Sequence, residues 1–124
     1  MSHSRIWLSA IGALLLVASA ARADGDPVRG QTLYESRCIA CHSLDANRTG
    51  PMHRGVFGRK AGSAAGFAYS PAVKGSIVLW DAETLDRWLT DPQKLIPGQR
   101  MNFRVALPED RADIIAYLKR ESAK

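Results

Sequence analysis

The stretch that decides the fold is Cys38-Ile39-Ala40-Cys41-His42, in which two cysteines separated by two residues are followed directly by a histidine. Thiols at this spacing can add to the vinyl groups of one haem, and the adjacent imidazole can then reach the iron. Cysteine and histidine are scarce residues, so composition alone seldom produces the pattern. The pentapeptide therefore predicts one covalently attached haem c, bound through Cys38 and Cys41, with His42 as an axial ligand.

Three other interpretations of the cysteine pair are weaker. A thioredoxin-like dithiol needs a βαβ context, and no strand-like alternation surrounds the pair. A structural zinc ion needs four ligands, yet the chain has only two cysteines. A disulfide that closes so short a loop would add little stability, and it would leave His42 without a role.

Residues 1–23 have the three parts of a secretory signal peptide. Arg5 supplies a positive charge, an apolar stretch runs from Ile6 to Ala20, and Ala21-Arg22-Ala23 is a small-x-small cleavage site. The apolar stretch is shorter than the roughly 20 residues that a membrane span needs. We therefore expect cleavage after Ala23, export to the periplasm and no membrane span in the mature chain.

The expected mature chain, residues 24–124, has the length of a single small domain. Arg5 and Arg22 lie in the leader, so the formal net charge of the mature chain is +3 rather than +5. The basic residues are dispersed, which argues against nucleic-acid binding. A domain this small buries a modest core, so we expect a large apolar cofactor to contribute much of the folding free energy.

All the regular elements that the sequence predicts are helices. Three main helices are expected, because capping residues and prolines precede apolar residues at helical spacing. They run from Asp26 to the Cys38 region, from Asp81 to Asp91, and onward from about Pro108. Residues 43–69 are rich in glycine and predict an ordered loop, for which a bound prosthetic group would provide a surface to pack on.

The ligand on the other face of the iron decides the function, and the candidates are Met52, His53 and Met101. Met52 and His53 follow His42 by only ten and eleven residues, so the chain would struggle to pass around the haem. Met101 follows Ile96-Pro97-Gly98-Gln99-Arg100, an irregular segment that suits an extended loop over the opposite haem face. We therefore predict that Met101 is the second axial ligand, in a His/Met pair that raises the redox potential.

With these residues identified, the chain resembles the class I cytochromes c, and in particular their mitochondrial-like bacterial subgroup. The matching stretches are CIACH (38–42), TGP (49–51), GRKAG (58–62), GFAYS (66–70), Trp80, IPGQRMNF (96–103) and RADIIAYLK (111–119). The resemblance implies a small all-α fold with three main helices, short helices and ordered loops packed around one haem. It also implies that the terminal helices cross, with Gly30 and Tyr34 against Ile114 and Tyr117.

The resemblance further implies roles for residues around the haem. The carbonyl of Pro51 would accept a hydrogen bond from the free ring nitrogen of the axial histidine. Arg59, Tyr69 and Trp80 would surround the haem propionates and offset their charge. Phe103 would cover the haem face on the methionine side.

Three residues depart from the mitochondrial pattern. Trp88 stands where a tyrosine bonds the ligand sulfur, Val73 replaces an asparagine, and Gln99 replaces a threonine near a propionate. Because these positions form the hydrogen-bond network of the pocket, we expect Trp88 to line the haem pocket and the redox potential to differ.

A haem with both axial positions filled by the chain has no open site for a substrate. We therefore expect a soluble one-electron carrier and not an enzyme, the alternative being a haem-based enzyme or sensor with a labile Met101. The expected partners are redox proteins with acidic docking surfaces, met in transient contacts by a monomeric carrier: a quinol-oxidising complex, dehydrogenase, oxidase, reductase or reaction centre. The basic residues expected to form a collar for docking are Arg37, Lys94, Arg100 and Arg104.

Overall fold

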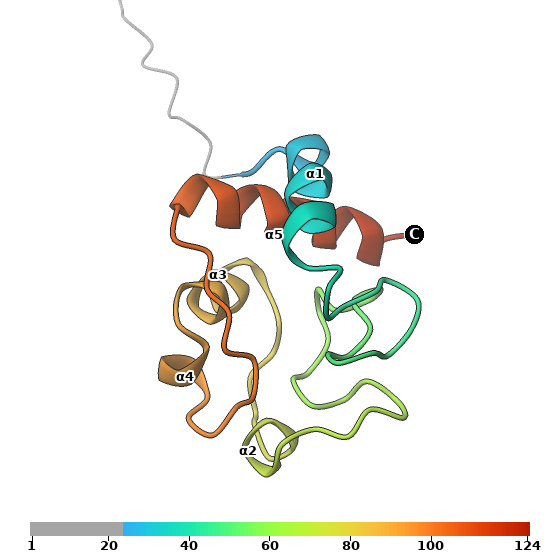
Figure 1. The fold of residues 1–124 in the computed structure, drawn as a ribbon, viewed down its shortest axis with the longest axis vertical. Helices are drawn as coiled ribbons and strands as arrows, with labels where there is room; N and C mark the ends of the chain where they lie inside the picture. Colours follow the sequence, from blue (N-terminus) through green and yellow to red (C-terminus); the bar gives the residue numbers. More distant parts are fainter. Residues whose placement is uncertain (1–23) are drawn as a thin grey trace, which may run out of the picture.

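The computed structural model describes residues 24–124, which form helices joined by long loops (Figure 1). The expected signal peptide, residues 1–23, lies outside the described residues. The helices are α1 (Pro27–Arg37), α2 (Pro71–Lys74), α3 (Ala82–Thr90), α4 (Pro92–Leu95) and α5 (Pro108–Ser122). Within the described residues, the β pairing is one isolated bridge between Lys60 and Leu79. The expected all-α fold of three main and additional short helices is confirmed.

The main helices begin where the sequence supplies a cap or a proline. The Asp26 side chain accepts a hydrogen bond from a backbone N–H of the first turn of α1, and Pro27 occupies its first position. At the start of α3, Asp81 and Thr84 form a capping box in which each side chain bonds the other's backbone N–H. Pro108 begins α5 without a side-chain cap.

A sharp turn separates α3 from α4. Asp91 is the C-cap of α3 and also the N-cap of α4, where its side chain accepts a hydrogen bond from the backbone N–H of Lys94. Pro92 occupies the first position of α4 and cannot continue α3, because it lacks the required N–H. Residues 96–107 then lead back to α5 as a loop (Figure 1).

The two terminal helices cross at a glycine, as expected. A Cβ at Gly30 would overlap the backbone carbonyl of Asp113 on α5, so only glycine allows this close approach. Beside the crossing, the rings of Tyr34 and Tyr117 pack with their centroids 5.2 Å apart. Figure 1 shows α1 lying across α5.

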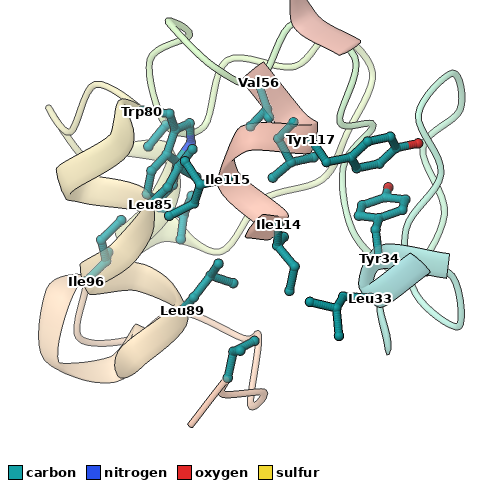
Figure 2. Packing of buried hydrophobic residues seen from close by; sticks show 14 residues of the cluster. Leu33, Tyr34, Val56, Trp80, Leu85, Leu89, Ile96, Ile114, Ile115 and Tyr117 are labelled. Atoms are coloured by element: carbon teal, nitrogen blue, oxygen red, sulfur yellow. The ribbon is translucent and has the colours of Figure 1, made fainter. Parts of the chain in front are cut away.

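The hydrophobic core is centred on α5. Ile114 and Ile115 contribute buried side chains, with α1 residues on one side and α3 residues on the other (Figure 2). Trp80, which precedes α3, and Ile96, which follows α4, belong to the same buried cluster. No helix within residues 24–124 has the length and apolarity needed to cross a membrane.

Charged side chains also hold α1 against α5. The Asp110 carboxylate is buried, with Arg29 Nη2 2.7 Å from one oxygen and Arg37 Nη1 3.0 Å from the other. Asp113 accepts a second bond from Arg29 and one from the backbone N–H of Asp26, at 2.7 Å. Hydrogen bonds from Arg29, and secondarily from Arg37, hold the pKa of Asp110 below its usual value despite its burial.

This cluster predicts how acid changes the stability of the protein. The pKa of Asp110 is lower in the folded state than in the unfolded state. The ionised Asp110 therefore stabilises the fold fully at pH values above its unfolded-state pKa, and this stabilisation is lost as the pH falls through its folded-state pKa. Asp110→Asn should lower the free energy of unfolding at pH 7, and the difference from wild type should shrink towards about pH 3. Denaturant titrations at both pH values measure this. Glu109→Gln, an exposed acid in the same helical turn without an ion pair among the described residues, is the matched control.

Candidate functional site

The CIACH pentapeptide extends α1 by a turn. Backbone N–H groups of Cys38 and His42 donate to the carbonyls of Tyr34 and Cys38, at 2.8 and 2.9 Å. The two thiols are free, with Cys38 partly buried and Cys41 exposed. Burial raises the pKa of the Cys38 thiol to about 11. The turn that follows α1 therefore contains both thiols and leads directly to the imidazole.

The imidazole of His42 is buried and is held by a hydrogen bond at one of its two nitrogens. Its Nδ1 lies 2.9 Å from the carbonyl oxygen of Pro51. A Cβ at Gly50 would overlap the ring, so the backbone of Gly50 lies against it. Burial lowers the pKa of His42, although the bond to Pro51 acts in the opposite direction. The ring is neutral at pH 7, with Nδ1 occupied and Nε2 available to bind a metal.

Arg48 is a residue of this site that the sequence analysis missed. Its guanidinium donates to the carbonyl of Ile39 and, at 3.3 Å, to the carbonyl of His42, which lie within and at the end of the pentapeptide. These bonds fix the loop that contains the thiols. No motif marks such a contact, since Arg48 lies in an irregular loop where spacing carries no information.

Met101 lies in the loop that follows α4. The backbone turns before it, where Gly98 has a φ of 93° and Gln99 N–H donates to the carbonyl of Ile96 at 3.1 Å. The Met101 side chain is partly buried and packs against the hydrophobic core. In Figure 1 the loops of residues 43–69 occupy one side of the molecule, and α3, α4 and this loop occupy the other.

The other candidate ligands lie on the His42 side. The ring of His53 stacks on the ring of His42, with centroids 3.9 Å apart and planes at 18°. Met52 precedes it, and its backbone N–H donates to the Asn47 side chain. Neither is therefore placed to bind a metal from the side opposite His42, which leaves Met101 as the ligand for that side.

Aromatic residues expected near the cofactor lie in several elements. Trp80 is buried and contacts Trp88 of α3 edge to face, with centroids 5.2 Å apart and planes at 60°. The hydroxyl of Tyr69 accepts a hydrogen bond from the backbone N–H of Ala64 at 2.9 Å. Phe103, two residues after Met101, is 41% exposed.

Arg59 has a buried polar group that lacks a partner. Its Nη2 donates to the carbonyl of Met52 at 2.9 Å, but its Nε is buried without a hydrogen-bond partner. Desolvation lowers the pKa of Arg59, and no carboxylate among residues 24–124 forms an ion pair with it. An anion close to a partly buried guanidinium offsets the desolvation of its charge. A haem propionate supplies such an anion, so Arg59 fits the predicted cofactor.

The three residues that depart from the mitochondrial pattern lie in α2, in α3 and in the loop that follows α4. Val73 is buried in the core, and Trp88 contacts Trp80. Gln99 Nε2 lies 3.3 Å from Gln93 Oε1, while its own Oε1 is buried and unpartnered. Gln99 Oε1 is therefore, after Arg59 Nε, a second buried polar atom without a hydrogen-bond partner in the described residues. It is an acceptor, whereas Arg59 Nε is a donor.

The expected basic collar is smaller than the sequence suggests. Arg37 is paired with Asp110, and Arg104 lies 3.1 Å from Asp91, so carboxylates offset both charges. Lys94 and Arg100 are exposed and have no ion pair within the described residues. These pairings could not be predicted from the sequence, because the acids lie on other elements of the fold.

Two thiols for covalent attachment, an oriented imidazole and a methionine in the opposing loop define a c-type cytochrome with His/Met ligation. A family model for cytochrome c matches residues 27–121. The chain belongs to the cytochrome c family, whose members transfer electrons and are not enzymes. It is accordingly a haem c electron carrier, with one haem bound covalently through Cys38 and Cys41 and with His42 and Met101 as its axial ligands.

Individual relatives agree with this assignment. The chain is 42% identical over 118 residues to cytochrome c2 of Rhodomicrobium vannielii, covering 91% of this chain and 93% of the relative. It is 44% identical over 103 residues to cytochrome c of Chlamydomonas reinhardtii, covering 80% and 92%. Among solved structures, cytochrome cH from Methylobacterium extorquens superposes with a TM-score of 0.74 at 44% identity, covering 77% of this chain and 99% of that one.

Proposed function

We propose that the protein is a periplasmic one-electron carrier, exported by a signal peptide of residues 1–23 that is removed to leave residues 24–124 as a single domain. The three-part leader supports export. The observation that supports the carrier function best is that the chain supplies both axial ligands, His42 and Met101, which leaves no position for a substrate. The haem supplies a reversible one-electron change at its iron when bound.

The proposed haem pocket assigns a task to each surrounding residue. Six residues are proposed to contact or position the haem in addition to the two cysteines and the two axial ligands. They are Pro51, Arg59, Tyr69, Trp80, Trp88 and Phe103. Pro51 orients the imidazole, and Arg59 offers its unpartnered Nε to a propionate. The aromatic side chains exclude water, which keeps the electrostatic environment of the site the same in both oxidation states.

Docking is proposed to depend on positive charge beside the Met101 loop. Lys94 and Arg100 are exposed on either side of Ile96-Pro97-Gly98 and are not offset by ion pairs in the described part of the chain. Such charges attract an acidic partner surface and accelerate a brief encounter. The donor is proposed to be a quinol-oxidising complex or a dehydrogenase, and the acceptor an oxidase, a reductase or a reaction centre, met by a monomer in transient contacts.

Salt dependence tests this docking surface. Replacing both Lys94 and Arg100 by glutamine should lower the second-order rate of electron transfer to an acidic redox partner roughly tenfold at low ionic strength, and high salt should remove the difference. Stopped-flow absorbance measures the rate. Arg87→Gln, which removes an exposed charge from α3, should retain the wild-type rate. Equal rates for the double variant and wild type at low salt would rule out this surface.

A further inference from the structure

His53 has a defined place beside the axial histidine that the haem site described above does not explain. Segment 50–54 runs along segment 41–44, with backbone bonds from Gly50 to Cys41, His53 to Ser43 and Arg54 to Leu44 at 2.8 to 3.0 Å. This pairing brings the ring of His53 onto the face of the His42 ring, 3.9 Å between centroids and 18° between planes. The stack is therefore built into the backbone of the loop.

A residue of helix α1 holds the ring of His53 in place. Its Nδ1 lies 2.9 Å from the hydroxyl of Tyr34, a residue of α1 that is 2% exposed. The Tyr34 ring in turn packs on Tyr117 of α5, as Figure 2 shows. Burial raises the pKa of Tyr34 and is the main cause that lowers the pKa of His53. A neutral imidazole and a protonated phenol thus meet in a hydrogen bond.

The hydrogen bond from His42 Nδ1 to Pro51 restrains the imidazole at one point in its own plane. This hydrogen bond by itself does not prevent the ring plane from rotating about the line through Nε2 and Nδ1. The reason is that the line lies close to the direction of the bond, and a hydrogen bond does not oppose rotation about its own axis. A flat ring stacked on the imidazole opposes this rotation. The hydrogen bond between His53 and the Tyr34 hydroxyl keeps this second ring in register with the first.

We propose that His53 is a positioning residue for the iron ligand, and that its stack on His42, held by the Tyr34 hydroxyl, fixes the angle of the imidazole plane about the Nε2–iron bond. The proposal rests on the assignment of His42 as an axial ligand. It assigns a purpose to a histidine that contacts both the axial histidine and the Tyr34 hydroxyl. Outer groups that orient a metal-bound histidine commonly tune the metal as well.

Proton NMR of the oxidised holoprotein tests the proposal, because the hyperfine shifts of the haem methyl groups depend on the orientation of the axial ligand planes. Tyr34→Phe keeps the aromatic ring but removes the hydroxyl from His53, and His53→Leu removes the stack. Both variants should change the order or the spread of the methyl shifts and should shift the midpoint potential in the same direction. Unchanged shifts and potential in Tyr34→Phe would overturn the proposal, even where His53→Leu yields no folded protein.

The matched control is Tyr117→Phe, which removes a hydroxyl from the neighbouring ring of the same cluster without touching His53. It should keep the wild-type methyl shifts whatever stability it loses, whereas an equal change in both tyrosine variants would indicate a general packing effect and contradict a specific role for His53. An incorrect assignment of His42 as an axial ligand would give a different result. The spectrum of the wild-type protein would then already lack the features of a His/Met centre, whatever the tyrosine variants show.

Discussion

Replacement of both Cys38 and Cys41 by alanine is expected to abolish covalent haem attachment and stable folding together. The described part of the chain, residues 24–124, is small, and its loops from residue 43 to residue 69 contain no α-helix that could pack independently. Arg59 Nε and Gln99 Oε1 are buried without partners, so the protein part alone leaves polar groups unsatisfied. Without the cofactor, the domain loses a large apolar contribution to its core.

Haem-stained denaturing gels and far-ultraviolet circular dichroism measure the two effects. The double variant should show no covalent haem and little cooperative unfolding. The single variant Cys41→Ala is the control. It still has the partly buried Cys38, so it should bind haem through one thioether bond. It therefore separates the effect of replacing a cysteine from the effect of losing the haem. A haem-free double variant that unfolds cooperatively at high temperature would contradict a cofactor-dependent fold.

Met101→Ala is expected to open one axial position and convert a closed centre into one that binds external ligands. The reduced variant should bind carbon monoxide at pH 7, and its midpoint potential should fall by an amount on the order of 0.1 V or more, since axial ligands set haem potentials over roughly 0.8 V. Absorbance titration with carbon monoxide and a redox titration measure these changes.

Met52→Ala is the control for this variant. Met52 precedes His53 on the His42 side, and its backbone rather than its side chain makes the hydrogen bonds to Asn47 and Arg59. The control should keep the wild-type spectrum and remain unreactive to carbon monoxide. If Met52→Ala opened the centre and Met101→Ala did not, the ligand assignment would be reversed.

The sequence was sufficient for features that depend on local chemistry. Asp26-Pro27 and Asp81 begin helices where expected, because caps and prolines act within one turn of chain. The α1–α5 crossing at Gly30 could also be predicted, since a glycine inside a helix is unfavourable unless another backbone approaches. The pentapeptide identified the cofactor because its spacing matches the chemistry of attachment.

Features that depend on long-range loop geometry could not be predicted. The short spacing from His42 argues against His53 as an iron ligand, but the stack of the two rings follows from backbone pairing between segments 41–44 and 50–54. Arg37 lies beside Cys38 in the sequence, yet the fold directs its charge to Asp110 on α5. Pairings of this kind require the positions of elements that are distant in sequence.

The absorption spectrum of the oxidised wild-type protein, followed by exposure of the reduced form to carbon monoxide at pH 7, tests the central assignment most directly. A His42/Met101 centre predicts a charge-transfer band from methionine sulfur to ferric iron, lost in Met101→Ala, together with no carbon monoxide binding by the wild type. A wild-type protein that lacks this band and binds carbon monoxide would contradict the closed His/Met centre.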